Sequence, residues 1–106
     1  MAYTALSAAA STGAGTTIVI PGGATTWTVQ LLHTGSPTSV IVDFEGTLDG
    51  TNWLTFRTHT MASSNDEFVL TPVALVTVRL NITALSGGST PTVTGWIEPG
   101  GRSGCS

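Results

Sequence analysis

Two acidic side chains two residues apart, Asp43 and Glu45, form the pair whose spacing in this sequence best offers chemistry. They lie in the run SVIVDFEGT, where apolar and polar residues alternate, so both carboxylates point to one face of an extended strand. Paired carboxylates can do acid–base work or bind Ca²⁺. More often such a pair is the wetted side of a strand, and we favour that interpretation.

Other catalytic patterns are missing from the sequence. His33 and His59 lie in or beside expected loops, and neither has a neighbouring cysteine or a paired histidine. The motifs H-x-x-x-H, C-x-x-C and G-x-S-x-G and the phosphate-binding glycine loop do not occur. We therefore expect no enzyme activity, no metal and no cofactor. A small hydrolase, built from residues distant in sequence, ranks last among the hypotheses.

Charge and composition exclude several classes of partner. Charged residues make up 8% of the 106 residues, lysine is absent, and Arg57, Arg79 and Arg102 are too scattered to form a basic patch. With a net charge of −3, a nucleic-acid partner is not expected. No apolar run approaches the roughly 20 residues of a membrane span, and residues 1–15 lack the pattern of a signal peptide, so we expect synthesis in the cytoplasm. The single Cys105 cannot form an internal disulfide.

The elements that position these residues are short strands separated by turn signals. Period-2 alternation is clearest in TTWTVQLL, SVIVDFEGT and ALVTVRLNI. The pattern predicts an all-β fold, a single antiparallel β-sandwich of about seven strands, of the immunoglobulin-like or jelly-roll type. The expected strands are residues 16–20, 25–32, 39–47, 53–59, 68–70, 74–82 and 91–97.

Three parts are expected along the chain: an N-terminal arm at 1–15, the β-sandwich domain at 16–98, and a flexible C-terminal tail at 99–106. The arm contains Ala, Ser, Thr and Gly, with Tyr3 and Leu6 as its larger apolar side chains. Because such a segment buries little area alone, we expect it to become ordered on a partner. The predicted core consists of Val29, Leu31, Val42, Phe44, Val76, Val78 and Leu80.

The corner LDGTNW between two expected strands is either a ligand site or a turn. Asp49-Gly50 is a favoured turn pair, since Gly accepts φ > 0 and Asp can hydrogen-bond its own turn. Asn52 can cap the same turn, and Trp53 begins the returning strand, where it is expected to cover Gly46. A hairpin with a glycine bulge explains these residues without a ligand.

The stretch FEGTLDGTNWLTF resembles the E-G-S-x-D-G-x-x-W hairpin of small bacteriophage virion proteins with β-sandwich folds. It is also similar to the S-x-D-G-x-x-W stretch of discoidin-type carbohydrate- and lipid-binding domains. The resemblance covers about 13 of the 106 residues. Discoidin-type domains are longer, secreted and often closed by a disulfide, whereas this chain is short and has one cysteine. The resemblance to virion proteins implies a capsid decoration (cement) protein, or another head or tail accessory.

The first hypothesis is therefore a virion structural protein, made in the host cytoplasm, that clamps subunits of the shell. Its expected partners are the major capsid protein or another virion protein, together with its own copies, many per particle. The candidate interface residues are Tyr3, Leu6, Arg79 and Trp96.

The second hypothesis is a carbohydrate-binding module that uses Trp27, Trp53 or Trp96 as a stacking platform. Trp96 is the informative residue, since in TVTGWIE the inward set should be Val93, Gly95 and Ile97. It then faces outward, where it marks either a protein interface or a sugar platform. A register shifted by one residue would bury it instead.

Overall fold

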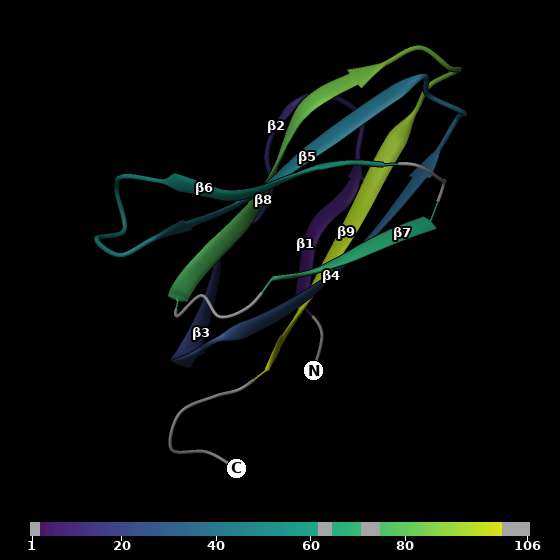
Figure 1. Cartoon of the computed structure of the whole chain (residues 1–106). Coiled ribbons are helices and arrows are strands. Elements are labelled where there is room, and N and C mark those ends of the chain that lie inside the picture. The colour runs from purple at the N-terminus through teal and green to yellow at the C-terminus, as the bar shows by residue number, and fades with distance from the viewer. Residues whose placement is uncertain (1–2, 62–64, 71–74, 101–106) are drawn as a thin grey trace.

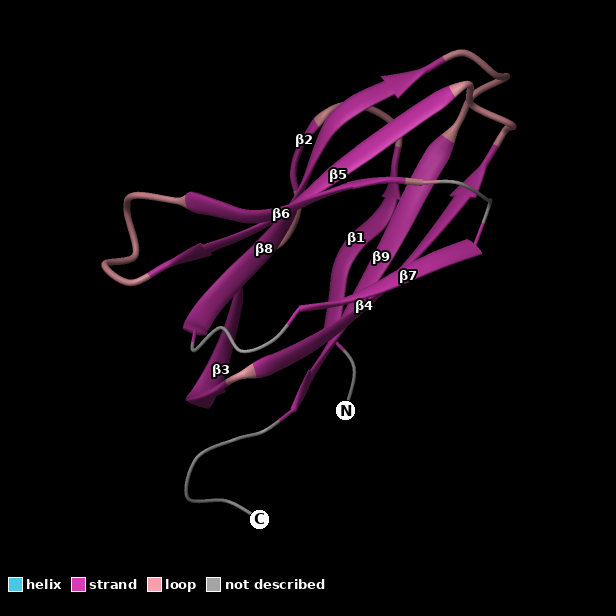
Figure 2. Ribbon diagram, viewed as in Figure 1, coloured by secondary structure: helices cyan, strands magenta, loops and turns pink. Residues whose placement is uncertain are grey.

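The computed structural model of the chain describes residues 3–61, 65–70 and 75–100. Over these residues it contains strands and no helix (Figure 2). One sheet, sheet A, contains, in spatial order, β1 (Tyr3–Ala9), β9 (Thr92–Gly100), β4 (Thr26–Thr34) and β7 (Asn65–Leu70). The other, sheet B, contains, in spatial order, β2 (Gly13–Ala14), β8 (Leu75–Ser86), β5 (Ser39–Thr47) and β6 (Leu54–Thr60). Strand β3 (Ile18–Ala24) also pairs with β8.

The two sheets pack face to face, and all their strand pairs are antiparallel (Figure 1). The prediction of an all-β sandwich is confirmed. All seven expected strands are present, and β5 has the expected bounds, 39–47. In the described residues no helix has the length and apolar character that crossing a membrane requires.

The core lies between the inner faces of the sheets because apolar side chains alternate with polar ones along β4, β5, β8 and β9. Trp27 is fully buried, with its ring centroid 5.6 Å from that of Phe44, which in turn lies 6.5 Å from Phe68. Burying one such side chain contributes about 1.5–3 kcal/mol. The largest fully buried side chains are Trp27, Phe44, Ile20, Leu31, Leu80, Ile82, Ile97, Val29, Val42, Val78 and Val93.

The structure corrects the expected N-terminal arm. Residues 3–9 form β1, an edge strand of sheet A that pairs with β9, and Ala5 and Leu6 are buried. The chain then crosses to sheet B, where the amide of Gly15 donates to the carbonyl of Leu80. Small side chains do not prevent a segment from joining a sheet, because the ladder is built from backbone groups.

The structure also corrects the expected C-terminal tail and one expected core residue. Of the expected tail at 99–106, Pro99 and Gly100 belong to β9, and residues 101–106 lie outside the described residues. Val76 was expected in the core but is 45% exposed, whereas Leu75 is buried. The β3–β8 ladder changes register between Val19 and Ala24, and this irregularity ends the simple alternation that holds from Val78 onward.

Candidate functional site

The corner after β5 directs its carboxylate to its own turn. Oδ1 of Asp49 accepts hydrogen bonds from the amides of Thr51 and Asn52 and from the hydroxyl of Thr47, at 2.8–2.9 Å. Oδ2 accepts a bond of 2.7 Å from the side-chain amide of Asn52. Gly50 has a φ of +82°, the left-handed conformation that this turn requires. Both carboxylate oxygens are therefore occupied within the hairpin.

These hydrogen bonds hold the pKa of Asp49 well below its usual range. The amide of Asn52 has the largest effect, followed by the amide of Thr51, and the side chains of Asn52 and Thr47 add to it. Each bond favours the charged carboxylate over the neutral acid. Asp49 consequently remains ionised and bound to the turn at neutral pH.

Trp53, expected to cover Gly46, has its ring beneath an arginine. The guanidinium of Arg79 lies 4.0 Å from the Trp53 ring centroid, and its Nε donates to Oε1 of Glu45 at 2.7 Å. The side-chain amide of Asn81 donates to the other oxygen of Glu45 at 3.1 Å. A β-carbon at position 46 would instead meet the side chains of Leu75 and Phe56.

This network accounts for Glu45 of the carboxylate pair and for Arg79, one of the interface candidates. Asp43 and Glu45 are on the outer face of sheet B, as expected, but Glu45 is only 7% exposed and is bound by Arg79 and Asn81. The described residues contain no group of three or more His, Cys, Asp or Glu placed to hold a metal ion. Arg79 joins β8 to β5 and to the start of the returning strand, so its contacts are within the chain.

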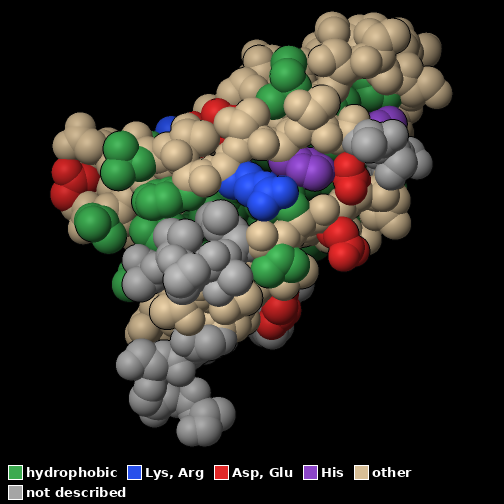
Figure 3. Space-filling model, viewed as in Figure 1, with side chains coloured by type: hydrophobic (Ala, Val, Ile, Leu, Met, Phe, Trp, Pro, Cys, Tyr) green, Lys and Arg blue, Asp and Glu red, His purple; other side chains and the backbone are tan. Residues whose placement is uncertain are grey.

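A second polar cluster lies between the edge strands β6 and β7, where the two sheets meet. Nε2 of His59 lies 3.0 Å from Oδ2 of Asp66, and the His59 ring lies 5.0 Å from that of Phe68. The guanidinium of Arg57 lies 5.1 Å from the centroid of the same Phe68 ring. On the face seen in Figure 3, arginine, histidine and acidic side chains lie side by side.

Sequence reasoning missed this cluster because it treated His59 alone. The period-2 pattern of β6 places Arg57 and His59 on one face of the strand, and this spacing was visible in the sequence. Their cross-strand partners on β5 are Phe44 and Val42, respectively. The partners on β7 could not be inferred, since they come from the other sheet. The contacts close the side of the sandwich with polar and aromatic groups.

Trp96 lies on the outer face of sheet A, in the register that the sequence predicts. Its strand neighbours are Thr4 on β1 and Gln30 on β4, while Gly95 and Ile97 on either side of it are buried. Trp96 itself is half-buried.

Other apolar side chains share this outer face. Leu32, opposite Thr94, is 37% exposed, and Val69, opposite Thr28, is 48% exposed. We call Thr4, Gln30, Leu32, Val69 and Trp96 the sheet A face.

The remaining interface candidates are not on this surface. Leu6 is 3% exposed and is a core residue, and Tyr3 is half-buried and packs against the core. Neither side chain therefore forms the projecting anchor that the arm hypothesis required. Trp27, one of the three expected sugar platforms, is fully buried.

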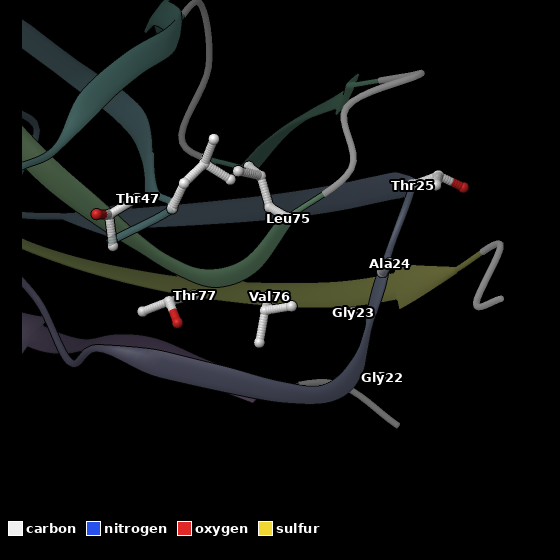
Figure 4. A pocket seen from close by; sticks show the side chains of 9 residues that line it. Gly22, Gly23, Ala24, Thr25, Thr47, Leu75, Val76 and Thr77 are labelled. Carbon is white, nitrogen blue, oxygen red and sulfur yellow. The ribbon is translucent and has the colours of Figure 1, made fainter. Parts of the chain in front are cut away.

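The β5–β6 hairpin projects from one end of sheet B (Figure 1). Exposed leucines lie on both sides of its turn. Leu48 is 84% exposed and Leu54 is 59% exposed, on either side of the turn. Beside them lies a cavity of about 350 Å³. Its lining, shown in Figure 4, comes from β3, β8 and the end of β5: Gly22, Gly23, Ala24, Thr25, Thr47, Leu48, Leu75, Val76 and Thr77. We call it the hairpin-end cavity.

Comparison with known proteins identifies a shared fold. No protein-family model matches the sequence, and no curated protein matches it. Among solved structures, the crystal structure of the SPBc2 prophage-derived protein YomS superimposes with a TM-score of 0.61. The two chains are 18% identical, and the match covers 92% of this chain and 90% of the other. This chain therefore has the same overall fold as a prophage-derived protein over nearly its whole length.

Proposed function

We propose that this chain is a non-enzymatic structural protein of a bacteriophage particle, a capsid decoration protein that attaches to the shell through protein–protein contacts. The observation that carries the proposal is the sheet A face, where a half-buried Trp96 lies on the same surface as the exposed apolar side chains of Leu32 and Val69. Tryptophan is enriched among the residues that dominate binding energy at protein interfaces.

The chemistry of this face suits a protein partner. The row of Trp96 contains Thr4, Gln30 and Glu67. Leu32 lies in one flanking row, and Val69 and Glu98 lie in the other. Neither described arginine lies on it, because Arg57 and Arg79 belong to sheet B. Interface cores are enriched in aromatic residues and interface rims are polar. Trp96 with Leu32 and Val69 matches such a core, and the exposed Glu67 and Glu98 match its rim.

The fold comparison supports the phage part of the proposal. A prophage-derived protein has the same sandwich over nearly the full length of both chains. The hairpin FEGTLDGTNWLTF, which resembles those of virion proteins, is the β5–β6 hairpin of this sandwich. Decoration requires many copies that each add a modest interface, and a small, sparsely charged sandwich suits that role.

The test is attachment to purified particles of the phage that encodes the chain. Wild-type protein should co-sediment with them, and Trp96→Ala should weaken attachment at least about tenfold, since losing an interface anchor costs about 2 kcal/mol or more. Phe56→Ala, which removes a 37% exposed aromatic ring from sheet B, is the matched control. Equal binding by wild type and Trp96→Ala would remove the sheet A face from the proposal. Absence of the chain from particles would end the proposal itself.

The carbohydrate-binding alternative now depends on Trp96 and Trp53. Trp27 is buried, whereas Arg79 covers one face of Trp53, and stacking on a sugar uses a single face. Titration of the wild-type chain with neutral oligosaccharides separates the two hypotheses. Saturable sugar binding that Trp96→Ala abolishes, without any attachment to particles, would replace the structural role with glycan recognition.

A further inference from the structure

The hairpin end of sheet B presents a projecting apolar side chain beside a hollow. Leu48 stands at the rim of the hairpin-end cavity and is 84% exposed, although a leucine gains about 1.5–3 kcal/mol from burial. Leu54 is 59% exposed on the other side of the same turn. In Figure 3 hydrophobic side chains gather at this end of the molecule.

The hollow depends on two glycines in β3. Gly22 and Gly23 line the cavity and have φ values of +80° and +74°, in the left-handed region that favours glycine. A β-carbon at position 23 would lie 3.1 Å from the carbonyl oxygen of Leu75 and 3.2 Å from Cγ2 of Val76. The backbone of β3 thus forms one wall and Val76, on β8, contributes to the other (Figure 4).

Charge favours a particular occupant. The side chains that line the cavity are aliphatic or threonine, and none of them is charged. Asp49, the residue after Leu48, is ionised and is not among the residues that line the cavity, and four hydrogen bonds direct its carboxylate into its own turn. Two copies of the chain, each with a net charge of −3, repel one another least where their surfaces are neutral.

We infer that the hairpin-end cavity is a self-association site, in which two copies pair about a two-fold axis and each inserts Leu48 into the cavity of the other. A two-fold interface uses the same patch on both copies, so a projection and a hollow must lie on one surface. Leu48 and the cavity meet this condition. The inference concerns contacts between copies and does not depend on the sheet A face.

Sedimentation velocity of the full-length chain over a concentration series tests the inference. The wild-type mass should rise from 10.8 kDa toward twice that value as concentration increases. Leu48→Asp should weaken the dimer at least about tenfold, because the inserted side chain would carry an unpaired charge into an apolar cavity. Leu32→Asp, the same change on the sheet A face, should leave the dimer unchanged. Melting temperatures of all three chains verify folding.

Disulfide trapping tests the geometry independently. In a Cys105→Ser background, one chain carries Leu48→Cys and a second carries Val76→Cys. Mild oxidation of the mixture should give a mixed disulfide dimer in greater yield than either chain gives alone, since a bridge requires α-carbons within about 7 Å.

Three outcomes would overturn the inference. One is a wild-type chain that remains monomeric at all concentrations, and another is a Leu48→Asp chain that dimerises as wild type does. The third is a monomeric wild type in which Leu48→Asp weakens only attachment to particles, since the occupant of the cavity would then be a different virion protein.

Discussion

Asp49 has the side chain of a ligand-binding residue, but its carboxylate stabilises its own turn. Its carboxylate accepts four hydrogen bonds from Thr47, Thr51 and Asn52, and its pKa is lowered as a result. A folded-state pKa below the unfolded value stabilises the fold at pH values above the unfolded pKa of about 4. That contribution is lost as the pH falls through the folded-state pKa.

The corresponding prediction compares wild type with Asp49→Asn in thermal melts between about pH 7 and pH 2. Wild type should melt at the higher temperature at neutral pH, because asparagine loses the charge and has no second oxygen to accept the bond that the side-chain amide of Asn52 donates to Oδ2. The difference should shrink steadily below about pH 4, where the wild-type carboxylate begins to be protonated in the unfolded state. A difference that is constant over this range would mean that the carboxylate charge contributes nothing to the turn.

Gly50 provides a second prediction at the scale of one residue. A β-carbon there would meet no neighbour within 4 Å, so any effect of substitution comes from its φ of +82°. Gly50→Val should reduce the free energy of unfolding by about 1–2 kcal/mol, because a β-branched residue is strained in the left-handed region. Thr51→Val introduces valine at the next position of the turn and should change the free energy of unfolding by less than about 0.5 kcal/mol. Urea denaturation measures both, and equal effects would contradict the conformational explanation.

At the scale of elements, the sequence predicts strands that alternate and misses strands built from small residues. Strand β5 was predicted at 39–47 because Val40, Val42 and Phe44 alternate with polar residues. Strand β1 was missed because its side chains give no comparable pattern, although Leu6 is in the core. The sequence shows the hydrophobic period of a strand. It does not show the backbone pairing through which an edge strand without such a period, such as β1, joins the sheet.

Clusters that join distant strands escape sequence reasoning for a related reason. The contacts of Arg57 and His59 with β7, and of Arg79 with Glu45 and Trp53, depend on which strands are neighbours. Spacing along one strand predicts the face on which a side chain lies, but not the residue that it contacts on another strand. The turn at Asp49 was predictable because all of its contacts lie within a few residues.

The placement of β1 in sheet A changes what is expected of substitutions in residues 3–9. Leu6→Ala should reduce the free energy of unfolding by about 2–5 kcal/mol, as for other buried leucines. Thr4→Ala, on the outer face of the same strand, should change it by less than about 0.5 kcal/mol. Chemical denaturation of the isolated chain gives both values. A small effect of Leu6→Ala would restore the expectation that this segment is an arm outside the core.

At the scale of the whole molecule, the proposed pairing of copies rests on where a sparsely charged chain exposes its apolar side chains. The composition was visible in the sequence, but the location of the exposed apolar side chains was not. Leu48 was placed in a turn and Val76 in the core, and the structure brings both to one cavity. The register shift in the β3–β8 ladder therefore accompanies the exposure of Val76, which the alternation of the sequence did not predict.

The last prediction concerns salt. If two copies pair through the hairpin-end cavity, the contact is apolar and contains no ion pair among its lining residues. Between about 0.05 and 0.5 M NaCl the dimer dissociation constant should then change by less than about threefold, and in the direction of tighter association. Salt screens the repulsion between two chains of net charge −3 and leaves the burial of leucine unaffected. Sedimentation at several ionic strengths measures the constant. Weakening of the dimer by about tenfold or more at high salt would mean that charged groups hold the copies together, and the cavity would not be the contact.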